Sequence, residues 1–324
     1  MNDLSAIGEF GLIAQIAKLK SDQGDHVVLG IGDDAALLKP SKHLTALTMD
    51  MAVEGVHFRR DWSSAIEIGR KIAAANLADV AAMGGRAHSL VVGLAAPKTL
   101  EIEWALDLAR GIGMECEREH CALVGGDTVQ SEAIVISIAA MGEVQHPVRR
   151  SGAQVGDRIY LIGLTGLSAA GLYALSHGVA GFDLLKEAHR VPRPLYEQAR
   201  QVAENSEVHA MCDVSDGLLA DLMHIAEASK VECEIDGDKL DVVRLTELAE
   251  VAGMDPKTWA LTGGEDHAFL VVASSLADLL NQENLVCREI GIVTASHSTG
   301  TVHLVNGPQS GLANSGFDHF RISP

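Results

Sequence analysis

Short apolar runs of strand length alternate with longer segments of helical periodicity along the whole chain. In the first half, VVLGI (27–31), HLTALTMD (43–50) and AIVISIAAMGEV (133–144) predict strands, because each is apolar and short. Residues 66–83 predict a helix that ends at Gly84. Elements that alternate in this way indicate an α/β or α+β fold, with mixed sheets packed against helices.

The length of the chain and one polar segment predict two domains. A chain of 324 residues has room for two domains at roughly 100–200 residues each. The segment HPVRRSGAQVGD (146–157) is polar, contains proline and glycine, and separates two apolar strands. We therefore expect domains at 1–148 and 149–324. In the second, RIYLIG (158–163) and AFLVVA (268–273) predict strands and 218–228 predicts a helix.

Composition excludes several classes of function. The 25 basic and 44 acidic residues give a net charge of -19, which argues against binding to nucleic acid or to an anionic membrane surface. No apolar run approaches the roughly 18 residues of a membrane span, and the N-terminus lacks the pattern of a signal peptide. Five cysteines without a CxxC spacing indicate free thiols. We expect a cytoplasmic protein.

The positions of the aspartates are the most informative feature for function. They follow predicted strands or precede a predicted helix, beside glycine or small residues and with few basic neighbours: Asp33, Asp34, Asp50, Asp127, Asp213 and Asp216. Any one of them could be a helix cap or an Asx turn. As a set they would repel one another unless a cation neutralised them. Hard divalent cations bind to such oxygen ligands.

A further carboxylate lies within the predicted helix 66–83. Ile72, Asn76, Asp79 and Met83 fall on one stripe of that helix, so the mostly apolar face contains an amide and a carboxylate. Isolated buried charge is costly. Asp79 is therefore either part of a satisfied hydrogen-bond network or a metal ligand.

Glycines adjoin these acids. GGDT (125–128) and GGED (263–266) read as turns next to strands, where glycine permits close approach of a ligand. The segment SDG (215–217) precedes a helix, whose N-terminus favours phosphate. Phosphate beside carboxylates requires a bridging cation, so the pattern indicates a metal–phosphate site of the kind used in nucleotide-dependent phosphoryl transfer.

Two glycine patterns compete with this interpretation. GIGDDA (30–35) matches a dinucleotide fingerprint, but its two aspartates would repel a pyrophosphate and Pro40 interrupts the helix that should follow. GLTGLSAAG (163–171) is more typical of helix–strand packing than of a cofactor site. The Walker pattern GxxxxGK[ST] does not occur. The basic pair Arg149–Arg150 is either ordinary surface charge or a neutraliser of ATP.

Taken in order, the motifs resemble those of the thiamine-monophosphate kinase family. The resemblance covers nearly the whole chain and rests on GEFGLI (8–13), IGDDAA (31–36), TMDMAVEGVHF (48–58), NLADVAAMGG (76–85), LVGGDT (123–128), RRSGAQVGD (149–157), CDVSDGL (212–218), TGGEDH (262–267) and GFDHF (316–320). IGDDAA, GGDT and DVSDGL are also similar to the wider superfamily of aminoimidazole ribonucleotide synthetase. VEGVHF, GGED and GFDHF are more specific to the kinases.

The resemblance implies a two-domain fold like that of aminoimidazole ribonucleotide synthetase, a homodimer formed through the first domain, and direct phosphorylation of thiamine monophosphate by ATP with several Mg²⁺ ions. The metal ligands that it implies are Asp33, Thr48, Asp50, Asp79, Asp127, Asp213 and Asp216. It implies ATP contacts at Gly126, Asp127, Arg150 and Ser215, and substrate contacts at His57, Glu265 and Phe317. An aromatic ring and a carboxylate would suit a thiazolium cation.

The chain departs from the family at Met49, Ala78, His267 and Ala268. His267 and Ala268 replace the usual tyrosine and acid after GGED, and Met49 replaces a frequent hydroxyl residue.

Three alternatives to the kinase stay open. They are another ATP-dependent enzyme of the superfamily, of cyclase or maturation type; a non-catalytic protein that binds divalent cations; and an NAD-dependent oxidoreductase.

Overall fold

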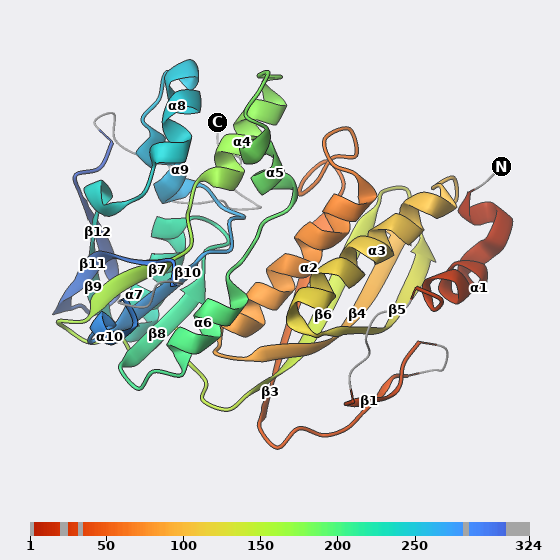
Figure 1. Cartoon of the computed structure of the whole chain (residues 1–324), viewed down its shortest axis with the longest axis horizontal. Helices are drawn as coiled ribbons and strands as arrows, with labels where there is room; N and C mark the ends of the chain where they lie inside the picture. The colour runs from red at the N-terminus through yellow and green to blue at the C-terminus, as the bar shows by residue number, and fades with distance from the viewer. Residues whose placement is uncertain (1–2, 20–24, 32–34, 281–284, 309–324) are drawn as a thin grey trace. The chain divides into compact units, whose positions relative to one another are not determined.

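The computed structural model describes residues 3–19, 25–31, 35–280 and 285–308. The chain divides into two compact units. Unit 1 comprises residues 1–80 and 85–145, and unit 2 comprises residues 81–84 and 146–324. Figure 1 shows the elements of both units along the chain.

Unit 1 is built on a four-stranded mixed sheet in the order β3-β6-β4-β5. Its strands are β3 (Leu44–Val53), β4 (Arg86–Ala96), β5 (Ala122–Gln130) and β6 (Val135–Val144). β6 pairs antiparallel with β3 and β4, and β4 pairs parallel with β5. β3 is therefore one edge of this sheet and β5 the other.

Helices cover one face of this sheet. α2 (Ala65–Ala82) and α3 (Ile102–Glu119) lie side by side across it (Figure 1). Two glycines allow the close approach of these helices. A Cβ atom on Gly69 would lie 2.3 Å from the Leu108 carbonyl oxygen, and one on Gly111 would lie 2.1 Å from that of Ile66.

Three smaller elements complete unit 1. Helix α1 (Leu4–Ile16) comes first in the chain, and the short strands β1 (Val27–Leu29) and β2 (Leu37–Leu38) pair with each other in a separate sheet.

Strand β3 exposes an apolar row. Leu47, Met49 and Met51 alternate along the strand and retain 70%, 59% and 55% exposure. Residues two apart on a strand point to the same face, so these three side chains share one face of the edge strand. Thr48 points the opposite way, since its hydroxyl is hydrogen-bonded to Asp79 of α2.

Unit 2 contains a six-stranded sheet in the order β12-β9-β11-β7-β10-β8, antiparallel except between β9 and β12. Its strands are β7 (Arg158–Ile162), β8 (Val208–Asp213), β9 (Val231–Asp236), β10 (Phe269–Ala273), β11 (Cys287–Ser296) and β12 (Thr301–Val305). β10 is fully buried between β7 and β8, which explains its uninterrupted apolar sequence.

The helices of unit 2 connect these strands. They are α4 (Leu167–Ser176), α5 (Asp183–Arg190), α6 (Tyr196–Ala203), α7 (Leu218–Ser229), α8 (Thr246–Ala252), α9 (Pro256–Thr262) and α10 (Ala277–Leu280), with short 3₁₀ turns at Gly237–Lys239 and Val243–Leu245. The core between sheet and helices is aliphatic, with Leu218, Leu222 and Ile225 of α7 fully buried in it.

The glycine-rich segment 163–171 packs elements together. A Cβ atom on Gly166 would lie 2.7 Å from the Ala260 nitrogen, and one on Gly171 would lie 2.1 Å from the Leu185 carbonyl oxygen. These are contacts between α4 and its neighbours α9 and α5. The segment is a packing motif, as expected, but these contacts join helices to one another rather than a helix to a strand.

Most predicted elements agree with the structure to within a few residues, and two strands are longer than expected. β3 continues past Asp50 to Val53, and β5 continues past Asp127 to Gln130. GGDT (125–128) is therefore part of a strand, and its prediction as a turn was wrong. The strands were predicted from apolar residues, so Asp50 and Asp127 were taken as strand ends although the strands continue through them.

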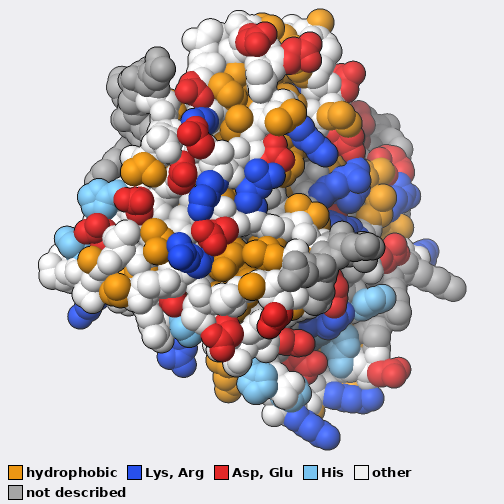
Figure 2. All heavy atoms as spheres, turned by 60° about the vertical axis from the view of Figure 1, so that its left-hand side comes forward, with side chains coloured by type: hydrophobic (Ala, Val, Ile, Leu, Met, Phe, Trp, Pro, Cys, Tyr) orange, Lys and Arg blue, Asp and Glu red, His pale blue; other side chains and the backbone are white. Residues whose placement is uncertain are grey.

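Among the described residues, no helix is long and apolar enough to cross a membrane. Figure 2 shows acidic and basic side chains interspersed over the face that it presents.

Candidate active site

In unit 1, strand β3 and helix α2 bring two of the expected metal ligands together. The Thr48 hydroxyl donates a hydrogen bond of 2.6 Å to Asp79 Oδ2. Both residues are half-buried. This bond fixes one oxygen of the Asp79 carboxylate and leaves the charge of the group without neutralising it.

The amide of Asn76 lies one turn before Asp79 in α2. Its nitrogen donates to the Ile72 carbonyl oxygen at 3.1 Å. Its oxygen is buried and has no hydrogen-bond partner among the described residues. Asn76 is thus an incompletely satisfied polar group beside Asp79 on the same helix.

Asp50 and Asp127 leave the sheet of unit 1 on opposite faces. Asp50 pairs with Ile138, which pairs with Val92. Asp127 belongs to the next row, opposite Gly93. Since neighbouring rows of a sheet point in opposite directions, Asp50 shares the face of Thr48, and Asp127 shares the face of the exposed apolar row.

An apolar pocket lies between α1, α3 and the strands β4 and β5. Its wall includes the aliphatic side chains Ile13, Ile16, Val92, Leu94, Leu108, Ile112 and Leu123. Residues 125–128 of β5 form its polar border. The pocket therefore combines an apolar interior with the backbone of the GGDT motif.

Gly126 is required by packing within the sheet. A Cβ atom there would lie 2.1 Å from the carbonyl oxygen of Val92 on the neighbouring strand. A side chain at this position would displace β5 from β4, so the glycine has a structural reason independent of any ligand.

His57 follows strand β3 and folds back on it. Its Nδ1 accepts a hydrogen bond of 3.1 Å from the backbone N–H of Val53. A nitrogen that accepts carries no proton, so this ring is neutral with its hydrogen on Nε2. The bond sets the orientation of the ring at the end of the strand.

In unit 2, the acids of CDVSDGL lie at the junction of β8 and α7. Asp213 is the last residue of β8, and α7 begins at Leu218. Asp221 in the first turn of α7 accepts hydrogen bonds from the backbone N–H groups of Asp216 (3.0 Å) and Gly217 (3.1 Å). Two of the donors expected to favour phosphate at this helix start therefore already have a carboxylate partner.

Asp221 was not among the predicted site residues. Burial, together with the nearby charge of Asp213, raises its pKa to about 7 against the lowering effect of its backbone donors. The spacing of Asp221 five residues after Asp216 was the available signal, because an acid in the first turn of a helix commonly bonds back to the residues before it.

The GGED loop is bound to the β8–α7 junction. The Glu265 N–H donates to the Ser215 carbonyl oxygen at 2.8 Å, and a Cβ atom on Gly264 would lie 2.3 Å from that same oxygen. Glu265 and His267 both have positive φ, at 63° and 50°. Such backbone strain persists only where the surroundings hold it, and it occurs frequently at functional sites.

Asp266 joins the same loop to helix α4. Its carboxylate accepts hydrogen bonds from the backbone N–H groups of Gly166 (2.5 Å) and Ser168 (2.8 Å), at the start of that helix. Burial raises its pKa to about 7, although these two donors act in the opposite direction. His189 lies nearby, 3.1 Å from the Ser168 hydroxyl and 3.8 Å from the Glu265 carboxylate.

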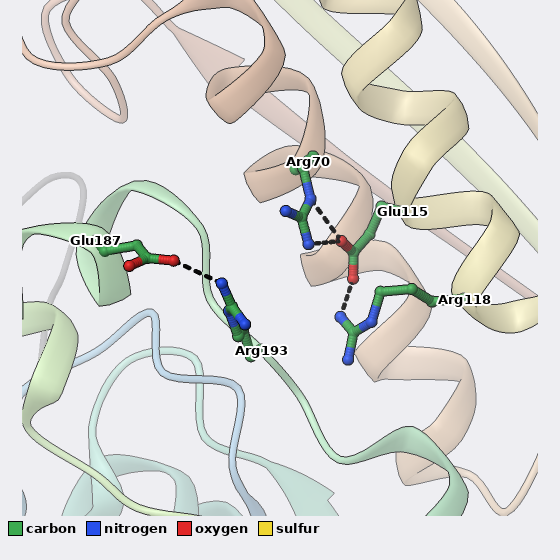
Figure 3. Close-up of polar contacts among 5 residues, drawn as sticks. All are labelled: Arg70, Glu115, Arg118, Glu187 and Arg193. Carbon is green, nitrogen blue, oxygen red and sulfur yellow. Dashed lines mark hydrogen bonds and ion pairs between the residues drawn. The ribbon is translucent and has the colours of Figure 1, made fainter. Parts of the chain in front are cut away.

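A cavity of about 440 Å³ opens beside this loop in unit 2. Its lining is mixed: aliphatic side chains from β7, α4 and α5 accompany Arg193, Arg244, Glu187 and Asp266. Glu187 and Arg193 form an ion pair of 2.5 Å (Figure 3). The cavity can accept a molecule that has both apolar and charged parts.

The remaining predicted site residues are Arg150, Asp33 and Phe317. Arg150 is exposed, and its carbonyl oxygen accepts a bond from the Ser229 hydroxyl at 3.0 Å. Asp33 and Phe317 lie outside the described residues. Within the described ranges, no three His, Cys, Asp or Glu side chains are grouped so that they could hold a metal ion.

The fold and these motifs define a class of proteins. The chain matches the family models described as AIR synthase related protein, N-terminal domain over residues 32–144 and C-terminal domain over residues 154–303. It shares its fold with a hydrogenase maturation protein HypE in complex with ATP, with a TM-score of 0.74 and 19% identity over 92% of each chain. The chain belongs to the AIR synthase-related superfamily.

More similar relatives narrow this assignment. The chain is 42% identical to a thiamine-monophosphate kinase of Mycobacterium tuberculosis over 82% of this chain and 81% of the relative. For that of Bacillus subtilis the identity is 31% over 97% and 99%. The structure of AaThiL complexed with AMPPCP and TMP matches with a TM-score of 0.78 and 32% identity over 98% of each chain. Within the superfamily, the chain belongs to the thiamine-monophosphate kinase family.

Proposed function

We propose that this chain transfers the γ-phosphate of ATP directly to the phosphate of thiamine monophosphate, forming thiamine diphosphate and ADP. The observation that carries the proposal is its membership of the kinase family over almost its whole length. The rigid junction of the GGED loop with the β8–α7 acids supports it. This junction puts the carboxylates for phosphate chemistry and the Glu265 side chain on one hydrogen-bonded framework.

The proposed ATP contacts are Gly126, Asp127, Arg150 and Ser215. In unit 1, the apolar pocket beside GGDT suits the flat, largely apolar adenine base, with Gly126 and Asp127 at its border. In unit 2, Arg150 and Ser215 are the proposed phosphate contacts. Arg150 is exposed, so its guanidinium can reach a bound anion without prior desolvation.

The donor set fits Mg²⁺. Carboxylate and hydroxyl oxygens from Thr48, Asp50, Asp79, Asp127, Asp213 and Asp216, with Asp33, are hard ligands. Bound Mg²⁺ would neutralise the phosphates and the developing charge in the transfer. Because Asp50 and Asp127 point to opposite faces of their sheet, the arrangement favours more than one ion.

Thiamine monophosphate is the proposed acceptor, with contacts from His57, Glu265 and Phe317. The Glu265 carboxylate could face the thiazolium cation, and the mixed cavity next to it could accept the ring system. His57 has its hydrogen on Nε2, because Nδ1 accepts from Val53. The ring is thereby prepared as a donor to a substrate oxygen.

The reaction needs no general base. The second pKa of a phosphate monoester is about 6, so the attacking oxygen has already lost its proton near pH 7.5. The difficulty is that one anion must approach another, and the residues above would act by neutralisation and alignment. A kcat/KM profile for wild type and His57→Asn should show the substrate's own ionisation in both. Loss of that ionisation together with nearly all kcat would make His57 a catalytic base.

A coupled assay of ADP release tests the function. Thiamine monophosphate should support turnover, whereas free thiamine, which offers a hydroxyl, should not. ADP release that is independent of thiamine monophosphate would favour another ATP-dependent enzyme of the superfamily. Metal binding without ATP binding in calorimetry would favour a non-catalytic cation-binding protein.

We also propose that the chain forms a homodimer through β3 of unit 1. The exposed row of Leu47, Met49 and Met51 on an edge strand supports this, since exposed apolar edges invite pairing. Wild type should sediment as a dimer, and Leu47→Glu with Met49→Glu should sediment as a monomer. Val251→Glu is the control, because Val251 is similarly exposed (60%) but lies on α8. A monomeric wild type would contradict the proposal.

A further inference from the structure

His267 makes a buried contact with one of the proposed metal ligands. Its Nδ1 lies 3.0 Å from Asp213 Oδ2. The two side chains retain 7% and 5% exposure, so water does not replace this contact at low cost. His267 comes from the GGED loop and Asp213 from the end of β8, which gives the contact a separation of 54 residues.

The backbone holds His267 in the orientation for this contact. Its N–H donates to the Val214 carbonyl oxygen at 3.0 Å, and the Val214 N–H donates to the Ala268 carbonyl oxygen at 2.7 Å. These bonds bracket a residue with φ of 50°. A strained residue bound on both sides has a fixed backbone, so the point from which its side chain extends toward Asp213 is fixed as well.

The chemistry of the pair fixes the roles of its atoms. An ionised carboxylate only accepts hydrogen bonds, so Nδ1 carries the hydrogen and donates to Oδ2. The imidazole orients Asp213 through one hydrogen bond. Oδ2 is occupied by this bond, and Oδ1 is the oxygen that stays available to a cation.

We infer that His267 is a positioning residue for metal binding: it holds the Asp213 carboxylate in one orientation, in which Oδ1 would be the oxygen that binds a cation. The inference rests on the proposed role of Asp213 as a Mg²⁺ ligand. Groups that orient metal ligands commonly contribute 10- to 100-fold to metal affinity. His267 also lines the mixed cavity of unit 2, so one side chain contacts both the metal ligand and the proposed substrate cavity.

Binding of Mn²⁺, measured by electron paramagnetic resonance on the full chain without nucleotide, tests the inference. His267→Leu removes the donor, and we expect roughly 10- to 100-fold weaker Mn²⁺ binding. His267→Asn places an amide donor near the position of Nδ1, and it should restore the affinity to within a few-fold of wild type. The same order should appear in the Mg²⁺ concentration needed for half-maximal activity.

The chain offers a matched control in His209. Its Nδ1 lies 2.9 Å from Asp157 Oδ2, also in unit 2, and Asp157 is not a proposed metal ligand. His209→Leu should lower the melting temperature without changing Mn²⁺ affinity. If His267→Leu does not fold, His267→Gln replaces it, since its longer amide does not reproduce the Nδ1 position.

The outcomes separate the inference from the function on which it rests. Wild type that binds no Mn²⁺ would overturn the proposed metal site itself. Wild type that binds Mn²⁺, with His267→Leu or His267→Gln within twofold of it, would overturn only the role of His267. Equal losses in His267→Leu and His267→Asn would also overturn it, because the donor would then be irrelevant.

Discussion

Two buried carboxylates, Glu115 in unit 1 and Asp213 in unit 2, are stabilised in different ways. Glu115 is fully buried in α3, and its two oxygens form ion pairs with Arg70 at 3.1 Å and with Arg118 (Figure 3). Asp213 is nearly as buried, and its side chain accepts from His267. One carboxylate is surrounded by cations, and the other is oriented by an imidazole ring.

This difference distinguishes a structural acid from one suited to bind a metal. Two guanidinium groups more than cancel the charge of Glu115, so a further cation there would be repelled. Around Asp213 the charge accumulates instead, since its own charge contributes to the raised pKa of Asp221. Burial alone therefore does not distinguish the two carboxylates; their hydrogen-bond donors do.

The largest expected effect comes from removing the charge of a proposed metal ligand. Asp213→Asn and Asp127→Asn should each lower kcat/KM by roughly 1,000-fold or more, about 4 kcal/mol in the activation barrier, because a neutral amide binds Mg²⁺ poorly. Chelation with EDTA should abolish activity and ATP affinity together. In the absence of metal, the unfolding free energy of the two variants should not fall, because each substitution relieves repulsion between neighbouring carboxylates. Full activity in both variants would remove the metal hypothesis.

Glu115→Gln should have the opposite profile. Removing one member of a buried ion pair costs about 3–5 kcal/mol when its partner stays buried. Arg70 and Arg118 retain 19% and 35% exposure, so we expect a loss of about 3 kcal/mol in the unfolding free energy, measured with urea. The kinetic constants should stay near those of wild type at temperatures where the variant is folded.

The control for Glu115 is a pair of the same chemistry in solvent. Arg59 and Asp61 form an ion pair of 2.7 Å with both side chains at least half exposed. Asp61→Asn should not change stability measurably, because water screens such pairs. A large kinetic defect in Glu115→Gln would mean that the ion pairs of α3 serve the reaction, and the distinction between the two carboxylates would fail.

The sequence predicted the layered fold because apolar periodicity reports burial. Helix 66–83 and strands 158–163 and 268–273 were placed within one residue or so of α2, β7 and β10. The same signal failed at Asp50 and Asp127, where strands continue through polar residues. A strand that carries ligands on its surface need not look like a strand in its sequence.

The residues that hold the site together were harder to predict from the sequence than the acids of its motifs. Asp213, Asp216 and Glu265 were recognised from their motifs, but Asp221 and Asp266 were not. The partners of Asp221 are backbone N–H groups four and five residues before it, so its signal was local and was missed. The Asp266 contacts, in contrast, span about 100 residues. No local pattern encodes such a pairing. His267 was noted only as a departure from the family, because its contact with Asp213 joins residues that are 54 apart in the sequence.

The smallest expected effect is a pH dependence of stability that arises from Asp266 in unit 2. Asp266 is stabilised by backbone amides, and burial raises its pKa from 3.8 to about 7. The folded chain thus keeps this proton up to about pH 7, whereas the unfolded chain loses it near pH 4. Stability from this group is therefore present at low pH and is lost as the pH rises from about 4 to about 7.

Asp266→Asn retains an acceptor for the start of α4 and does not titrate. Between pH 5 and pH 8, measured in EDTA, the variant should gain about 2 kcal/mol of unfolding free energy relative to wild type. The comparison with the variant isolates Asp266 from Asp221, whose pKa is raised in the same direction. A constant difference between variant and wild type would mean that Asp266 ionises normally, and that two amide donors stabilise a buried carboxylate as well as two guanidinium groups do.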